Sequence, residues 1–222
     1  MNWQNILYSL PGIVIGLTIH EFCHAIAADR LGDSTAREMG RLSFNPLRHI
    51  DPIGALFLVF AGFGWAKPVQ FNPGNLSHPR RDKAIIAAAG PISNFITALI
   101  FIGLIKAWFI LPGYISSPVN AERILSVIYS RAFIAFMDGV LRAATINLGL
   151  FVFNLLPIPP LDGSHIAFSG LNLKRKTELL IMKIGGPLLF IIIIIQNRAG
   201  ITILPIGKLV SALLYLFLPE LK

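Results

Sequence analysis

Two histidines and a glutamate stand inside an apolar run that is long enough to cross a membrane as a helix. The run extends from Leu7 to Ala28 and contains the sequence His20-Glu21-Phe22-Cys23-His24. A membrane-spanning helix needs about 20 apolar residues, whereas an ionisable group at bilayer depth costs on the order of 2.5 to 3.5 kcal/mol. Such groups normally face a protein interior or a watery cavity, so the run predicts a functional site within a membrane helix.

The spacing of the two histidines predicts a metal site. Residues four apart lie on the same face of an α-helix, so His20 and His24 can both bind one metal ion. Glu21 then lies beside that ion, where its carboxylate can accept a proton from water whose pKa zinc lowers to about 7. This is the chemistry of peptide hydrolysis.

The composition predicts a membrane protein with several spans. Hydrophobic residues make up 55% of the 222 residues, and the mean hydropathy of +0.70 lies well above that of a soluble domain. Several apolar runs are present, with no long polar stretch for an appended soluble domain. We expect one membrane-embedded domain over residues 1–222, which retains its first helix because no Lys or Arg precedes it.

The net charge of +8 is better explained by membrane topology than by nucleic-acid binding. Basic residues cluster in two connections between apolar runs, and by the positive-inside rule both connections are expected to be cytoplasmic. The two histidines then lie in the cytoplasmic half of the first helix. We expect a multi-pass protein of the cell membrane, embedded in the lipid bilayer, with no nucleic-acid partner. The basic residues in question are Arg30, Arg37, Arg41, Arg48, Lys67, Arg80, Arg81, Lys83 and Lys174-Arg175-Lys176.

The apolar runs predict an all-α polytopic bundle of about five to six transmembrane or re-entrant helices. Long helices are expected over roughly 7–31, 82–111, 128–156, 178–195 and 201–218. The run over 53–65 has about 13 residues, too few to span comfortably, which favours a re-entrant or interfacial segment. Residues 64–71 partly alternate and are bounded by turn residues, which predicts a short extended segment lining a substrate groove.

A third metal ligand is expected just after the helix over 128–156. A catalytic zinc usually has three protein ligands and one open position. The chain here reads Asn154-Leu155-Leu156-Pro157-Ile158-Pro159-Pro160-Leu161-Asp162-Gly163. Its prolines interrupt the helix and free backbone groups that can hold an extended substrate. We therefore expect His20, His24 and Asp162 to bind one Zn²⁺.

In these motifs the chain resembles the site-2 proteases, a family of intramembrane zinc metalloproteases. The resemblance rests on the histidine motif, on Gly90-Pro91-Ile92-Ser93-Asn94 and on the run from Asn154 to Gly163. The stretches over 45–52 and 64–69 look like the small bacterial and archaeal branch that lacks PDZ and CBS domains. The resemblance implies the same three zinc ligands, Glu21 as the base that activates water, and Asn154 as a residue that steadies the substrate or the oxyanion.

The resemblance also implies a membrane-associated β segment between the first two core helices, whose edge binds an unwound substrate. The expected substrate-binding residues in it are Gly64, Trp65, Ala66, Lys67, Pro68 and Val69. Asn94 is added to this substrate site, with the bridging of two helices as its alternative role. The alternative for Asn154 is the capping of backbone groups.

Four further titratable residues are interpreted without a catalytic role. His165 is either a partner of Asp162 or a solvated loop residue, whereas His49 and His78 lie in polar loops. Cys23, the single cysteine, is interpreted as a small apolar filler.

Together these features predict a zinc endopeptidase that cuts the transmembrane segments of membrane protein substrates near the cytoplasmic face. Two alternatives come from other classes. A membrane metal transporter also needs His and Asp at bilayer depth, and it predicts metal flux with a Glu21 that is dispensable or itself a ligand. A scaffold with a structural zinc normally has four protein ligands, and the sequence offers no convincing fourth.

Overall fold

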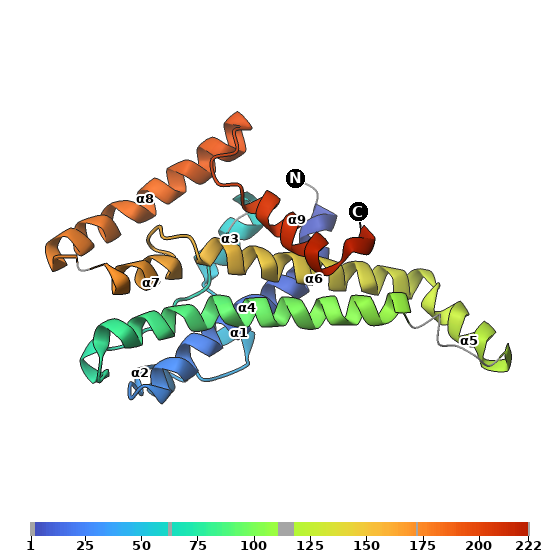
Figure 1. The fold of residues 1–222 in the computed structure, drawn as a ribbon, viewed down its shortest axis with the longest axis horizontal. Helices are drawn as coiled ribbons and strands as arrows, with labels where there is room; N and C mark the ends of the chain where they lie inside the picture. Colours follow the sequence, from blue (N-terminus) through green and yellow to red (C-terminus); the bar gives the residue numbers. More distant parts are fainter. Residues whose placement is uncertain (1–2, 62–63, 111–117, 172, 222) are drawn as a thin grey trace.

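Three long helices form the centre of the molecule. The computed structural model describes residues 3–61, 64–110, 118–171 and 173–221. Within these ranges, α1 (Trp3–Arg30), α4 (Pro79–Ile110) and α6 (Arg131–Asn154) pack against one another (Figure 1). The end of α1 and the start of α4 lie at the same end of this bundle, whereas α6 returns from the other end (Figure 1). The chain is therefore predominantly helical, as its apolar runs predict.

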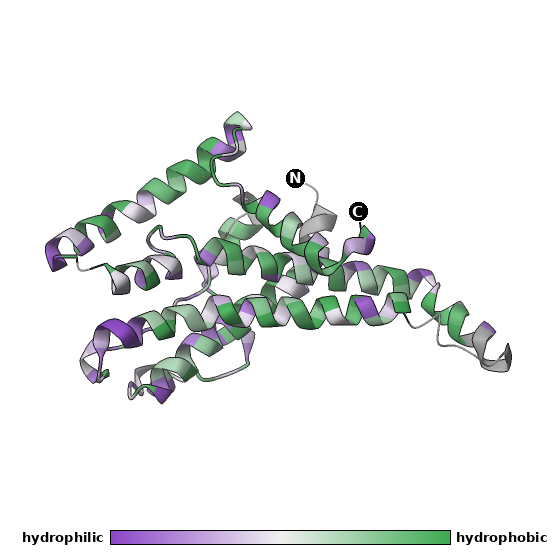
Figure 2. Ribbon diagram, viewed as in Figure 1, coloured by the Kyte–Doolittle hydropathy of each residue, from purple (hydrophilic) through white to green (hydrophobic). Residues whose placement is uncertain are grey.

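Four of the described helices are long and apolar enough to cross a membrane. They are α1 from Leu7 onward, α4, α6 and α8 (Arg175–Ala199). Apolar residues occupy most of the length of α6 and α8 (Figure 2), and many large apolar side chains on the outside of the molecule are exposed. Lipid is the solvent that suits such a surface. The chain is a multi-pass membrane protein.

Two of the predicted helices are corrected by the structure. The helix expected over 128–156 begins only at Arg131, because Ser130 caps it: the Ser130 hydroxyl accepts a hydrogen bond from the Phe133 N–H at 3.2 Å. The residues before this cap belong to a separate helix, α5 (Pro118–Ile128). The predicted span over 201–218 is wrong, because α9 (Ile206–Phe217) starts only after Pro205 and has 12 residues. Such a helix is about 18 Å long, short of the bilayer core.

The connection from α1 to α4 leaves and rejoins the bundle at the same end (Figure 1), and its helix α3 reaches the first half of α1, where Ala55 and Leu58 line a cavity with Leu10 and Val14. It contains α2 (Thr35–Glu38), two 3₁₀ turns at Pro46–Arg48 and Pro73–Asn75, and α3 (Pro52–Ala61). With 10 residues, α3 is about 15 Å long and too short to span. Residues 62–63, near the end of the short apolar run, and residue 111, the predicted end of the second long helix, lie outside the described residues.

The predicted β segment is represented by one antiparallel bridge in the described part of the chain. Ile50 pairs with Ala66, and the Lys67 N–H donates to the His49 carbonyl at 2.8 Å. The return of this segment toward α4 is tied to the end of α1 by Asp33, whose buried carboxylate accepts hydrogen bonds from the Asn72 N–H and the Asn75 amide. The segment is thus extended, but it forms no named strand within the described residues.

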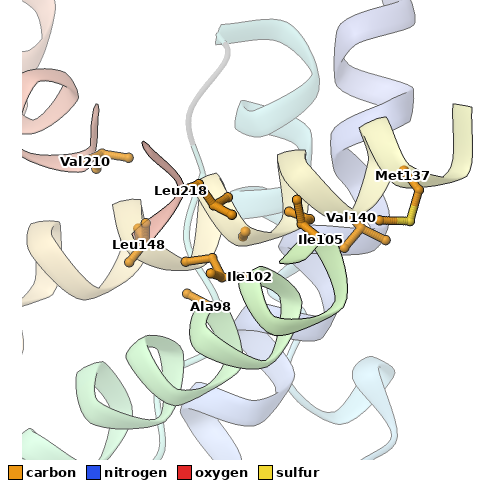
Figure 3. Close-up of a cluster of buried hydrophobic side chains, with 9 residues drawn as sticks. Ala98, Ile102, Ile105, Met137, Val140, Leu148, Val210 and Leu218 are labelled. Carbon is orange, nitrogen blue, oxygen red and sulfur yellow. The ribbon is translucent and has the colours of Figure 1, made fainter. Parts of the chain in front are cut away.

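The apolar core lies between α4, α6 and α9 (Figure 3). Its buried side chains come from α4, from α6, and from α9 with the residue that follows it: Ala98, Ile102, Ile105, Met137, Val140, Ala144, Leu148, Val210 and Leu218. The short helix α7 (Asp162–Gly170) packs against α4, which brings the first residue of α7 to the histidines on α1. By contrast, only 11% of the apolar window of α8 is buried, so α8 contributes little to this core.

Candidate metal centre

The structure brings His20, His24 and Asp162 together at the junction of α1, α4 and α7. The Nε2 atoms of the two histidines are 3.0 Å apart, and Asp162 Oδ2 lies 3.2 Å from His20 Nε2 and 3.4 Å from His24 Nε2. Both histidines are buried and Asp162 is partly buried.

Hydrogen bonds at the far side of each ring fix which nitrogen faces the site. His20 Nδ1 lies 2.6 Å from Asn94 Oδ1, and His24 Nδ1 lies 2.7 Å from the Ile86 carbonyl oxygen. Both of these oxygens accept hydrogen bonds, so each Nδ1 carries the ring proton. Each neutral ring therefore presents the lone pair of its Nε2 to the other ring and to Asp162. This is the arrangement of metal-binding histidines with their supporting hydrogen bonds.

The donor set fits a zinc ion. Two nitrogen lone pairs and a carboxylate oxygen converge, and such groups repel one another unless a cation or a proton lies among them. Four-coordinate zinc with Zn–N distances of about 2.0–2.1 Å separates two tetrahedral ligand atoms by about 3.3 Å. The observed separations of 3.0, 3.2 and 3.4 Å match that value. Three protein ligands also leave the fourth position that a catalytic zinc requires.

A buried asparagine pair supports His20 from behind. The Asn94 amide donates to the Gly16 carbonyl and to Asn147 Oδ1, both at 3.0 Å, and Asn147 in turn donates to the Ala143 carbonyl at 2.8 Å. Both asparagines are fully buried, so Asn94 joins α1, α4 and α6 and orients His20. Sequence reasoning missed Asn147. The available signal was a polar residue within an apolar helix, about two turns before Asn154.

Glycine allows α4 to approach the two histidines closely. A Cβ atom added at Gly90 would lie 2.6 Å from His24 Cε1 and 2.7 Å from His20 Cε1. Gly163 has a similar role beside Asp162, because a Cβ atom there would lie 2.5 Å from the Leu156 carbonyl oxygen. Gly90 thus makes room for the two histidine rings, and Gly163 for the backbone that follows α6.

The extended segment is held over Glu21 by a buried arginine. Glu21 is buried, and its Oε2 accepts a hydrogen bond from the Val69 N–H at 3.0 Å. The Arg41 guanidinium, also buried, donates to the carbonyls of Arg48, Lys67 and Pro68, the last at 3.2 Å. Burial lowers the pKa of Arg41, whereas the nearby Glu21 carboxylate acts in the opposite direction. Sequence reasoning treated Arg41 only as a topology signal.

A cleft of about 450 Å³ opens beside the metal ligands. Asn154 lies in its wall at the end of α6, where its amide donates to the Leu150 carbonyl at 3.0 Å. His165 also lines the cleft, and burial lowers its pKa. Neither Asn94 nor Lys67 is among the cleft-lining residues. Of the residues predicted from the sequence, the cleft contains His20, Glu21, His24, Gly64, Trp65, Ala66, Pro68, Val69, Asn154 and Asp162.

His49 differs from the sequence interpretation of a polar loop residue. It is 1% exposed, its Nε2 donates to the Ser43 carbonyl at 2.7 Å, and its carbonyl accepts the hydrogen bond from Lys67. His49 therefore packs between the loop that follows α2 and the extended segment.

Comparison with known proteins gives one family and several relatives. The family model of peptidase family M50 matches residues 8–193. YwhC of Bacillus subtilis, named as a candidate zinc metalloprotease, is 38% identical over 72% of this chain and 67% of its own length. Rip2 of Mycolicibacterium smegmatis, named in the same way, is 27% identical over 84% of this chain and 66% of its own length.

The match to a third relative covers a smaller part of that relative. Rip2 of Mycobacterium tuberculosis is 29% identical over 69% of this chain, and the match spans about half of that relative, 53%. No solved structure matches the chain.

Proposed function

Because the chain belongs to peptidase family M50, the site-2 protease family of zinc metalloproteases, we propose that it cleaves membrane protein substrates within or near their transmembrane segments. The observation that carries this proposal is the ligand set of His20, His24 and Asp162 beside Glu21 in one cleft of a membrane bundle. A soluble substrate would not require a site on a membrane-spanning helix.

Glu21 transfers the proton, and Asn154 orients the substrate. When bound, zinc polarises a peptide carbonyl and acidifies water. The Glu21 carboxylate follows His20 directly on α1 and lines the cleft, so it accepts the proton of the attacking water and delivers it to the leaving amine. Asn154 commits one amide hydrogen to Leu150, and the second remains to donate to the substrate carbonyl.

The extended segment supports binding of an unwound substrate by strand addition. Lys67 directs its N–H to His49 and its carbonyl to Arg41. Alternate residues of an extended chain point these groups to opposite sides, so those of Ala66 face away from His49. Ala66 also lines the cleft. A substrate strand that pairs with this edge would carry its backbone past the metal ligands.

The orientation of the bundle supports cleavage near the cytoplasmic face. Arg30 ends α1, and Arg80 and Arg81 begin α4, at the same end of the bundle (Figure 1). By the positive-inside rule this end is cytoplasmic. Both histidines lie in the half of α1 that is nearer to it. The plasma membrane is the proposed location, and single-span or multi-span membrane proteins are the proposed substrates.

The proposal is tested with purified protein in liposomes that also contain a single-span model substrate. We expect cleavage by the untreated protein, a cut position within or next to the cytoplasmic end of the span by mass spectrometry, and no cleavage after zinc chelation. A metal-sensitive dye inside the same liposomes measures zinc flux. Zinc flux without cleavage would contradict a protease and favour a transporter.

A further inference from the structure

A second cavity of about 230 Å³ lies next to the metal-site cleft. The two spaces share part of their walls, namely Leu17 and Leu150 from the helices and Gly64, Trp65 and Ala66 from the extended segment. The second cavity therefore adjoins the place where we propose that the substrate binds.

The walls of this cavity are mostly apolar, and Thr18, His49 and Asp51 are their polar members. The apolar members come from α1 through Leu10, Ile13 and Val14, from α3 through Ala55 and Leu58, and from α6 through Ile146. An apolar cavity of about 150 Å³ is large enough to stay dry and bind benzene. The cavity described here is therefore large enough for an aromatic ring or a branched aliphatic side chain.

The extended segment borders the cavity on the side toward the cleft, and tight backbone packing holds it there. A Cβ atom at Gly54 would lie 3.0 Å from the Trp65 nitrogen, so α3 and the segment touch backbone to backbone. Trp65 also packs against Phe57, with ring centroids 5.2 Å apart. These contacts fix the mouth of the cavity relative to Ala66.

A substrate strand that pairs with the extended segment can place one of its side chains in the cavity. Successive side chains of an extended peptide point to opposite faces, and pockets for alternate side chains give specificity while main-chain hydrogen bonds give affinity. A substrate strand paired with Ala66 therefore directs one side chain toward the cavity. We propose that the cavity is a specificity pocket for one large apolar side chain of the substrate, such as Leu or Phe. This inference rests on the proposed protease function.

Filling the pocket tests this assignment. The substrates are single-span proteins in which each residue around the cut position is replaced in turn by Ala, Leu and Phe. We expect the wild type to prefer Leu or Phe over Ala at one position by about 10-fold or more in kcat/KM. Val14→Phe, which fills the cavity, should reduce that preference to within about 2-fold by slowing cleavage of the large substrates. Ile15→Phe is the control, because Ile15 is the next residue of α1 and is exposed; it should keep the preference.

Two results of this experiment would overturn the pocket. One is a wild type with no size preference at any position. The other is a Val14→Phe variant that slows cleavage of the Ala, Leu and Phe substrates equally, as a general structural effect would.

A crosslinking experiment separates failure of the pocket from failure of the protease function. Cys23 is the single cysteine, so the Cys23→Ala, Glu21→Gln double variant is a cysteine-free, inactive background. One new cysteine is then introduced at Ala55→Cys, which lines the cavity. The control is Leu56→Cys, at a position that is 61% exposed. Substrates carry a single cysteine at each position of the span in turn. We expect a disulfide with Ala55→Cys at one substrate position and none with Leu56→Cys.

The combined results distinguish the two proposals. A crosslink at Ala55→Cys with no cleavage by the wild type would keep the binding pocket and refute the protease. Cleavage by the wild type without that crosslink would refute the pocket alone. Co-purified lipid that is lost in Val14→Phe, with no substrate crosslink, would assign the cavity to a lipid chain and would also overturn the pocket.

Discussion

Replacing Gly90 with alanine should expel the metal while leaving the helix bundle folded. The new Cβ atom would lie 2.6 Å from His24 Cε1 and 2.7 Å from His20 Cε1, and it would also press on His24 Nε2. Carbon atoms in contact are normally about 3.5–4.0 Å apart, so the rings or α4 must move by about 1 Å. Metal–ligand distances tolerate only about 0.2 Å.

The expected loss for Gly90→Ala follows from these distances. Overpacking of this kind costs about 1–3 kcal/mol, partly offset by the gain of about 0.5–1 kcal/mol for alanine over glycine in a helix. A displacement of about 1 Å at a reacting group costs about 100-fold in rate. We therefore expect substoichiometric zinc, at least about a 100-fold loss of cleavage, and a net loss of stability of at most about 2.5 kcal/mol, which leaves the bundle folded.

The matched control for Gly90→Ala is Gly103→Ala on the same helix. A Cβ atom at Gly103 has nothing within 4 Å, so this variant should keep zinc and activity at wild-type levels. Zinc is measured by elemental analysis and cleavage on the same samples. Stoichiometric zinc together with wild-type cleavage in Gly90→Ala would refute the packing of α4 against the two histidines.

Three further predictions concern the groups around the site. Asn94→Ala removes the acceptor for His20 Nδ1 and should weaken zinc affinity by about 10–100-fold in a chelator competition, and unchanged affinity would contradict the orienting role. Arg41→Ala removes the hydrogen bonds to the carbonyls of Lys67 and Pro68. It should raise KM and lower cleavage by about 10-fold or more at unchanged zinc content. Loss of zinc from this variant would contradict a role of Arg41 confined to the extended segment. Burial of Asp33 acts to raise its pKa, but hydrogen bonds from Thr35, Asn75 and Asn72 lower that pKa. The ionised Asp33 carboxylate therefore stabilises the fold fully above the ordinary pKa of about 3.9. This stabilisation is lost as the pH falls through the folded-state pKa. Asp33→Asn should therefore flatten the acid side of the thermal-stability profile, and an unchanged profile would contradict this contribution.

The sequence was sufficient to predict the helical membrane bundle and the clustering of His20, His24 and Asp162. The His20 and His24 spacing is a local property of one helix, and the proline-interrupted end of α6 drew attention to Asp162. The close approach of α4 to both histidines at Gly90 is visible only in the structure.

What the sequence did not reveal depends on contacts between distant segments. Arg41 and His49 lie in a connection that reads as polar, and their burial arises only when the loop after α2 folds onto the extended segment. Asn147 needs the packing of α6 on α4 before it meets Asn94. The length of α9 was misjudged because apolar composition continues on both sides of Pro205, whereas the helix itself begins only after that residue.

The most direct test of the zinc endopeptidase is a paired measurement of bound zinc and substrate cleavage in the wild type and in Glu21→Gln. Glutamine keeps the shape of Glu21 but cannot accept the proton of water, while the three metal ligands are untouched. We predict one zinc ion per chain in both proteins, and cleavage of the single-span substrate by the wild type only. Cleavage by Glu21→Gln at the wild-type rate, with zinc bound, would contradict the role of Glu21 as the base.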